Sequence, residues 1–125
     1  MKTIIRPAKA APAVGPYNLA VRAGDLLFCA GQIPLDPATG QLVSGDIQAQ
    51  TERVLENIRL ILEDAGLSFR NVVKSTVFMT NLADFAAMNE MYAKFFPAEA
   101  PARSTVLVAA LPRGAAVVIE VIAHF

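Results

Sequence analysis

The C-terminal segment from Ala115 to Phe125 is a predicted β-strand in which both faces are apolar. Its odd-numbered positions are wholly apolar, and its even-numbered positions are apolar except for Glu120 and His124. Because successive side chains of a strand point to opposite faces, such a strand needs cover on both sides of its sheet. Two helices are predicted in the chain, and they can hide only one face. We therefore expect the second face to be buried against further copies of the protein.

Two segments of the sequence carry apolar residues at helical spacing. In the first, from Asp46 to Gly66, apolar side chains recur three or four positions apart between Ile47 and Ala65. Either Asp46 or Ser44 is suited to cap the start of this helix, because their side-chain oxygens accept hydrogen bonds from free backbone N–H groups. Gly66 is a suitable terminator, since glycine adopts the left-handed conformation that commonly follows a helix.

The second helix is predicted from about Leu82 to Phe96. Asn81 is its expected cap, and Pro97 ends it because proline cannot continue a helix. The large apolar side chains of this segment fall on one stripe, which we expect to face the core. They are Phe85, Met88, Tyr92, Phe95 and Phe96.

Four more segments have the composition of β-strands, namely Leu19–Ala23, Leu26–Ile33, Asn71–Thr80 and Arg103–Leu111. The residues before Leu19 are predicted to form a loop. The first two strands form a predicted hairpin around Gly24-Asp25, and the last one leads into the C-terminal strand through the turn Pro112-Arg113-Gly114. Together these elements predict an α+β fold, with a mixed β-sheet and both helices on one face. A single domain is expected to span residues 1–125.

The charge and the residue counts disfavour several classes of function. Lysine plus arginine and aspartate plus glutamate both number 11, without a basic cluster, whereas nucleic-acid binders normally carry a basic excess. No apolar run is long enough for a membrane span and no secretory signal opens the chain, so a cytoplasmic protein is expected. One histidine, one cysteine and no glycine-rich phosphate loop predict neither a metal nor a nucleotide cofactor.

Three single residues each allow more than one interpretation. Cys29 is expected to be a small buried core side chain and His124 a surface residue at a strand end; the alternative is a nucleophilic pair formed by the two. Gly31 interrupts a predicted strand. A glycine in that place indicates either a β-bulge or the close approach of another group to the backbone.

Arg103 stands at the start of an otherwise apolar strand. A partly buried guanidinium without a partner is costly, so a carboxylate is expected to satisfy it. One candidate is Glu120, which shares a face with Arg103 if the last two strands are joined by a four-residue turn but not by a three-residue turn. The other candidate is the carboxylate of a ligand, which the planar guanidinium binds through two hydrogen bonds. The residue pattern leaves both open.

Several stretches resemble the RidA/YjgF family, in order and over essentially the whole chain. They are AAPAVGPYNLAV, LLFCAGQIPLDPATG, VVKSTVFMTNLADFAAMNEMYAKFF, FFPAEAPARSTVLVAALPRG and VVIEVIA. The resemblance implies the chorismate-mutase-like α+β fold of that family and a homotrimer with ligand clefts between subunits. It also implies a hydrolase without a cofactor. Such a deaminase converts reactive 2-imino or enamine acids, such as 2-aminoacrylate and 2-iminobutanoate, to 2-oxo acids and ammonia.

The same resemblance implies a set of site residues. The family's carboxylate-binding arginine matches Arg103 in PARS, its GPY tyrosine matches Tyr17, its GQIP glycine matches Gly31 and its helix asparagine matches Asn89. In this assignment Arg103 fixes the substrate carboxylate while the backbone at Gly31 contacts the ligand. Tyr17 and Glu120, or an ordered water, assist proton transfer as water adds to the imine carbon.

Three positions depart from the family's pattern. The family commonly ends VEIEAIA, and the activation of water is credited to the first of its two glutamates. Here Val118 replaces that first glutamate, and Glu120 keeps the second. Ala30 stands where many members carry serine or threonine, and Thr105 replaces a cysteine. Both Ala30 and Thr105 belong to the predicted substrate-binding residues. Two alternative functions follow. One is a non-catalytic binder of small carboxylates, and the other, disfavoured by the neutral charge, is a ribonuclease or translation inhibitor.

Overall fold

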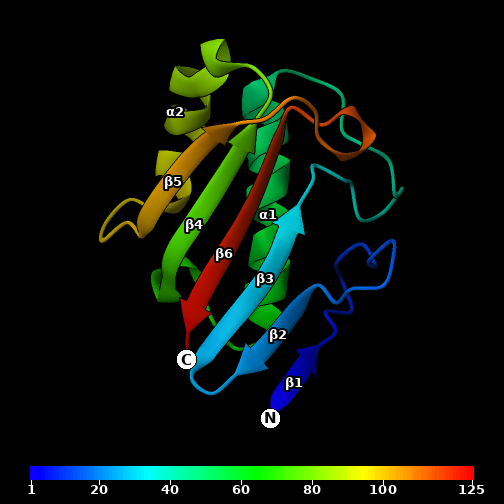
Figure 1. Ribbon diagram of the computed structural model, residues 1–125, viewed down its shortest axis with the longest axis vertical. Helices are drawn as coiled ribbons and strands as arrows, with labels where there is room; N and C mark the ends of the chain where they lie inside the picture. Colours follow the sequence, from blue (N-terminus) through cyan, green and yellow to red (C-terminus); the bar gives the residue numbers. More distant parts are fainter.

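The structure, a computed structural model, describes all residues from 1 to 125, which form one six-stranded sheet and two α-helices (Figure 1). The order of the strands across the sheet is β1-β2-β3-β6-β4-β5. Only β4 and β5 run parallel; every other neighbouring pair is antiparallel. The elements are β1 (Lys2–Ile5), β2 (Ala20–Ala23), β3 (Leu26–Gln32), α1 (Ile47–Asp64), β4 (Val72–Met79), α2 (Phe85–Phe95), β5 (Ala102–Leu107) and β6 (Val117–His124).

Helix α1 has the ends that its sequence predicts. The Asp46 side chain accepts a hydrogen bond from the backbone N–H of Ala49 at 2.9 Å, so Asp46 rather than Ser44 is the cap. Gly66 follows the helix with φ of 77°, the left-handed conformation that glycine adopts at low cost. The apolar stripe of α1 is fully buried against the sheet, and it includes Val54, Leu55, Ile58, Ile61 and Leu62.

Helix α2 begins later than its sequence predicts. Leu82–Asp84 form a short 3-10 helix, and the predicted cap Asn81 serves this turn by accepting a hydrogen bond from the N–H of Ala83 at 3.0 Å. The α-helix then runs from Phe85 to Phe95 and stops before Pro97. A tighter first turn is common at helix ends, and the spacing of apolar residues does not reveal it.

The hairpin around Gly24-Asp25 is confirmed, since β2 and β3 pair antiparallel there. The prediction that the residues before Leu19 form only a loop was wrong, because Lys2–Ile5 pairs with β2 as the edge strand β1. Four residues with only two apolar side chains carry too weak an alternation to reveal a strand. Edge strands are commonly this short and this polar.

The prediction that the last two strands adjoin across the Pro112-Arg113-Gly114 turn was also wrong. β4 lies between them, pairing parallel with β5 and antiparallel with β6. Ser75 of β4 is aligned with Arg103, whereas its successor Thr76 is aligned with Glu120. Because adjacent residues of a strand point to opposite faces, Arg103 and Glu120 lie on opposite faces of the sheet. An ion pair between them within one protomer is therefore excluded.

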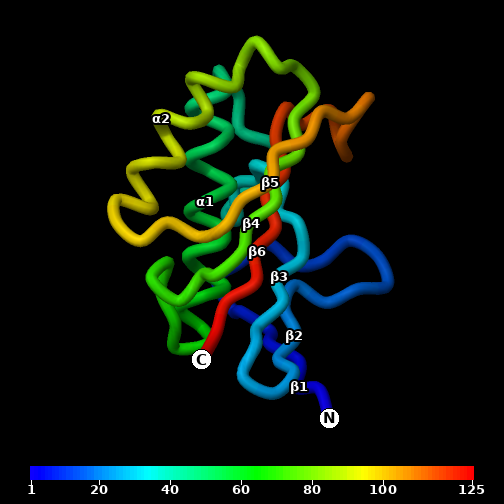
Figure 2. The backbone as a smooth tube through the Cα atoms, turned by 60° about the vertical axis from the view of Figure 1, so that its left-hand side comes forward, coloured from blue at the N-terminus to red at the C-terminus, as the bar shows by residue number.

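Both helices lie on one side of the sheet, as predicted, and no helix covers the other side (Figure 2). We call this second side the open face. Large apolar side chains from β3 and β5 stand on it with substantial exposure, 42% for Phe28 and 40% for Val106. Sheet faces of this kind are normally covered in a finished assembly. No helix of the structure is long and apolar enough to cross a membrane.

Candidate functional site

Arg103 projects from the edge strand β5 toward the helix side of the sheet. Its guanidinium carbon lies 4.7 Å from the ring centre of Tyr92 and 5.7 Å from that of Phe85, both on α2. The side chain makes neither a hydrogen bond nor an ion pair with any group of the chain; the one ion pair in the structure joins Arg59 to Glu56. The guanidinium is thus held by its faces, and its N–H groups remain available to a ligand.

Tyr92 is itself fixed by a hydrogen bond to the neighbouring strand. Its phenolic oxygen lies 2.6 Å from the Ser75 hydroxyl, and both residues are buried. Burial raises the pKa of Tyr92, although the hydrogen bond with Ser75 and the charge of Arg103 both act in the opposite direction. Tyr92 therefore stays neutral at physiological pH, and Arg103 supplies the charge of this region.

Two further residues of this region have polar atoms without partners. Asn89 lies between Phe85 and Tyr92 on the same face of α2, and its Oδ1 is buried without a hydrogen bond. Thr105 follows Arg103 by two positions on β5, hence on the same face, and its Oγ1 is likewise buried and unpartnered. Buried polar atoms without partners are rare, and these two lie on the same side of the sheet as the unpaired guanidinium, where a bound ligand would supply partners for them. We call Ser75, Asn89, Tyr92, Arg103 and Thr105 the arginine site.

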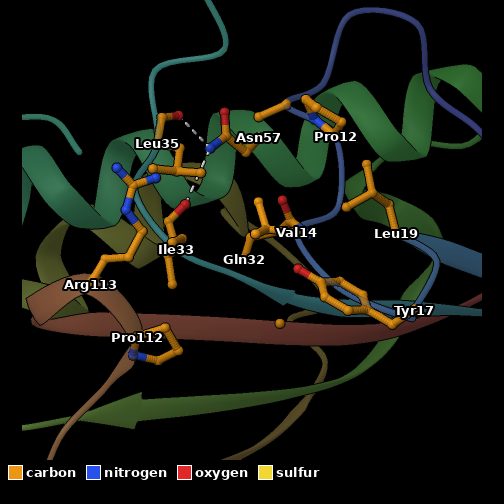
Figure 3. Close-up of a pocket in the computed structure, with 12 residues that line it drawn as sticks. Pro12, Val14, Tyr17, Leu19, Gln32, Ile33, Leu35, Asn57, Pro112 and Arg113 are labelled. Atoms are coloured by element: carbon orange, nitrogen blue, oxygen red, sulfur yellow. Dashed lines mark hydrogen bonds between the residues drawn. The ribbon is translucent and has the colours of Figure 1, made fainter. Parts of the chain in front are cut away.

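A second region of interest is a cavity of about 280 Å³ at the far end of β3, which we call the loop pocket. Tyr17 lies on one side of it and Arg113 on the other, with Gln32 and Ile33 between them (Figure 3). The Asn57 side chain donates hydrogen bonds to two backbone carbonyls of the wall, those of Ile33 and Leu35. The lining residues are Ala11, Pro12, Val14, Tyr17, Leu19, Gly31, Gln32, Ile33, Leu35, Asn57, Pro112 and Arg113.

Gly31 shows both features that its sequence context allows. The register of β3 against β6 shifts between Cys29 and Gln32, which makes a bulge at Gly31. A Cβ atom on Gly31 would also lie only 2.8 Å from Cγ1 of Val118. Gly31 does not have a positive φ, so the requirement for glycine comes from Val118 and not from the backbone conformation.

We expect Gly31→Ala to lower the free energy of unfolding by about 1–3 kcal/mol, because the added methyl group overpacks the contact with Val118. Val118→Ala makes room for it, so the double variant should lose less stability than the sum of the two single variants. Chemical denaturation at one protein concentration measures this coupling. Strict additivity of the two losses would show that Val118 is not the reason for the glycine.

The arginine site and the loop pocket do not form one site within a protomer. They stand on β5 and at the end of β3, with β6 and β4 between these strands. Three strand spacings separate them by roughly 14 Å. The predicted site residues Arg103, Asn89 and Thr105 are therefore brought together, while Tyr17 and Gly31 lie elsewhere.

The remaining predicted site residues occupy two further places. Glu120 is exposed on the open face, beside Phe28 and Lys74 in a shallow depression. Ala30 is half-buried next to the bulge, and its backbone N–H donates to the Leu19 carbonyl at 2.8 Å, which ties the N-terminal loop to β3. Neither residue contacts Arg103 in the protomer.

The alternative of a Cys29–His124 nucleophilic pair is excluded. Cys29 belongs to the buried core, as expected, and burial raises its pKa to about 12. His124 is exposed at the strand end and is aligned with Leu26, three residues from Cys29 on β3, hence on the opposite face. A thiol held neutral in the core is unreactive.

Sequence reasoning placed Tyr92 in the core and did not assign it, or Ser75, to the site. Both are indeed buried, but the ring of Tyr92 also contacts the guanidinium of Arg103. The sequence shows the position of Tyr92 on α2 relative to Phe85 and Asn89. It does not show that β5 pairs with β4, which brings Arg103 under this helix.

Comparison with known proteins gives a consistent result. Residues 8–125 match the protein family described as Endoribonuclease L-PSP. The chain is 50% identical to a RutC family protein of Pyrococcus horikoshii over 99% of this chain and 98% of that one. It is 45% identical to the 2-iminobutanoate/2-iminopropanoate deaminase of Capra hircus, over 98% and 90% of the two chains. Among solved structures it is similar to TdcF of E. coli with bound serine, with a TM-score of 0.93, 44% identity and 98% coverage of both chains.

Proposed function

The chain belongs to the endoribonuclease L-PSP family, which includes the Rid and RutC proteins, and on this premise we propose that it hydrolyses reactive 2-imino acids and their enamine tautomers. The products are 2-oxo acids and ammonia, and 2-aminoacrylate and 2-iminobutanoate are the proposed substrates. The observation that carries the proposal is the guanidinium of Arg103, which lacks a protein partner beside two unpartnered polar atoms.

In the proposed reaction Arg103 binds the substrate carboxylate through two parallel hydrogen bonds. Charge-assisted bidentate bonds are about twice as strong as neutral ones, and the aromatic walls of Tyr92 and Phe85 keep water from competing. Thr105 and Asn89 contribute hydrogen bonds from the same side. The substrate is thereby held at one end, and its C=N carbon is fixed in position for attack.

The second end of the substrate is proposed to meet the loop pocket of a neighbouring protomer. Each protomer carries an arginine site on β5 and a loop pocket beyond β3. A cyclic arrangement in which β5 of one protomer faces the loop pocket of the next would bring the two together at every interface. The exposed apolar side chains of the open face, Phe28 and Val106, support an assembly that covers them. We propose a homotrimer built from the single domain 1–125, acting in the cytoplasm.

The chemistry needs water, proton transfers and no cofactor. A water molecule adds its oxygen to the imine carbon while the nitrogen takes up a proton. The amino group of the tetrahedral intermediate then takes up a second proton and leaves as ammonia, while loss of the hydroxyl proton forms the C=O bond of the 2-oxo acid. Tyr17 and Glu120, contributed across the proposed interface, or an ordered water are assigned to these proton transfers. Positioning alone supplies part of the acceleration, because such imines already hydrolyse in water.

The proposal is tested by generating 2-iminobutanoate in situ and following its loss with and without the purified protein. We expect acceleration that is proportional to the protein concentration, with one ammonia and one 2-oxobutanoate formed per imine consumed. A rate equal to the uncatalysed one would contradict deaminase function for this substrate.

A second candidate is a non-catalytic binder of small carboxylates. It is favoured by Val118, which stands where the family commonly has a glutamate and is buried against Gly31 instead of offering a base. Calorimetry with 2-oxobutanoate separates the two functions. Binding that depends on Arg103, without acceleration of imine loss, is the result that supports the binder.

The third candidate is a ribonuclease, which the name of the family suggests, or a translation inhibitor. The equal numbers of acidic and basic residues speak against it, because phosphate contacts normally require a basic surface. RNA binding at micromolar affinity or better that falls steeply with added salt would support this function over the other two.

A further inference from the structure

We propose that Tyr92 and Ser75 are positioning residues of the arginine site: the Ser75–Tyr92 hydrogen bond locks the aromatic ring on which the Arg103 guanidinium rests, and so presets it for a carboxylate. The proposal rests on the proposed function, since it concerns how Arg103 holds its ligand. It adds two residues that the resemblance to the family did not assign.

The three side chains come from three adjoining elements. Ser75 and Arg103 are aligned neighbours on the parallel strands β4 and β5, so both point toward α2. Tyr92 on α2 reaches across them, with its hydroxyl 2.6 Å from Ser75 Oγ and its ring 4.7 Å from the guanidinium carbon. One ring therefore bridges the strand that anchors it and the strand that carries the arginine.

The guanidinium needs such a support because no protein oxygen holds it. An arginine has several rotatable bonds, and fixing them on binding costs free energy that would weaken the complex. A face-on aromatic contact restricts the side chain without using any N–H donor. Phe85 supplies a second such contact at 5.7 Å, but it has no hydroxyl with which to be anchored.

The hydroxyl of Tyr92 serves no other visible purpose. The ring already packs against Phe96, with ring centres 4.6 Å apart, so a phenylalanine would fill the same space. A buried hydroxyl costs desolvation unless it is paired, and here its partner is Ser75, which is fully buried and paired only with Tyr92. The pair thus fixes the orientation of the ring rather than adding apolar packing.

The experiment measures the Kd of 2-oxobutanoate by calorimetry and the KM and kcat for 2-iminobutanoate, in Tyr92→Phe, Ser75→Ala and the double variant. We expect each variant to raise Kd and KM about three- to tenfold with kcat nearly unchanged, because the support acts on the bound carboxylate throughout the reaction. The double variant should be no weaker in binding than either single one, since both remove the same bond.

Stability separates positioning from a merely structural role. Each single variant leaves one buried hydroxyl unpaired and should unfold at lower temperature, whereas the double variant removes both partners and should recover most of that loss. The weakened carboxylate binding should persist in the double variant. If its affinity recovers together with its stability, the hydrogen bond is only structural and the proposal fails.

Thr51→Val is the matched control, since Thr51 is also fully buried and its hydroxyl has no partner, on α1. Its Kd should equal that of the wild type. Two further outcomes overturn the inference. One is a Kd within twofold of the wild type in all Tyr92 and Ser75 variants, while Arg103→Ala loses binding. The other is a loss of affinity in Thr51→Val as large as that in the Tyr92 and Ser75 variants. If the wild type binds no 2-oxobutanoate, the proposed function fails first, which distinguishes the two failures.

Discussion

Arg103→Ala is expected to abolish the acceleration of 2-iminobutanoate hydrolysis and the binding of 2-oxobutanoate. The variant loses the positive charge of the arginine site and both hydrogen bonds to the carboxylate. Charge-assisted hydrogen bonds contribute about 1.5–3 kcal/mol each, so kcat/KM should fall by roughly two to four orders of magnitude. Steady-state kinetics and calorimetry on the same preparation measure both effects.

Two control variants make this result specific. Arg103→Lys keeps the charge but not the planar pair of donors, and should recover only part of the affinity. Arg70→Ala removes an exposed arginine of the 3-10 helix Phe69–Asn71, which contacts no residue of the arginine site, and should leave the kinetics unchanged. Wild-type rates in Arg103→Ala would show that the substrate carboxylate is held elsewhere.

Phe28→Glu is expected to leave the fold of the protomer intact, to prevent assembly and to remove hydrolysis. Phe28 is 42% exposed on the open face, so a charge there is tolerated by the isolated protomer. In the proposed assembly the same residue is covered, and an unpaired buried carboxylate costs several kcal/mol. Circular dichroism tests the fold, and analytical ultracentrifugation compares the mass of the variant with three times the protomer mass.

Ala93→Glu provides the comparison, because Ala93 is exposed on α2, on the helix side of the sheet. This variant should assemble and hydrolyse imines like the wild type. A wild-type protein that sediments as a monomer, or a monomeric Phe28→Glu variant with full activity, would contradict a site shared between protomers.

The helices and the open face follow from local patterns in the sequence. The apolar spacing between Ile47 and Leu62, the Asp46 cap and Gly66 each act within one turn of the chain, so the sequence alone indicates α1. The apolar character of both faces of β6 likewise predicted a sheet with one face left open, and the structure has such a face. How other copies cover that face stays a prediction.

The order of the strands depends on pairing between segments that are far apart in the sequence, so local patterns did not reveal it. Successive strands are commonly neighbours, which favours a hairpin of β5 and β6, yet β4 takes the place between them. This insertion changes the site, because it aligns Arg103 with Ser75 under α2 and leaves Glu120 on the other face. Neither outcome can be derived from the length of the turn.

The candidate site was predictable in part. A charged arginine at the start of an apolar strand already indicated Arg103 as a candidate. The resemblance of the sequence to a known family supported this residue and indicated Asn89 and Thr105 as well. The support by Tyr92 was not indicated, since an aromatic residue on a buried helical stripe has the pattern of an ordinary core residue. Only the contact of 4.7 Å with the guanidinium distinguishes it.

A crystal structure of the protein soaked with 2-oxobutanoate tests the central claim most directly. We expect the ligand carboxylate to accept two hydrogen bonds from the Arg103 guanidinium, with the Tyr17 side chain of a neighbouring protomer lining the same cleft. A guanidinium already bonded to a carboxylate of a neighbouring protomer, with the ligand absent from it, would contradict the account.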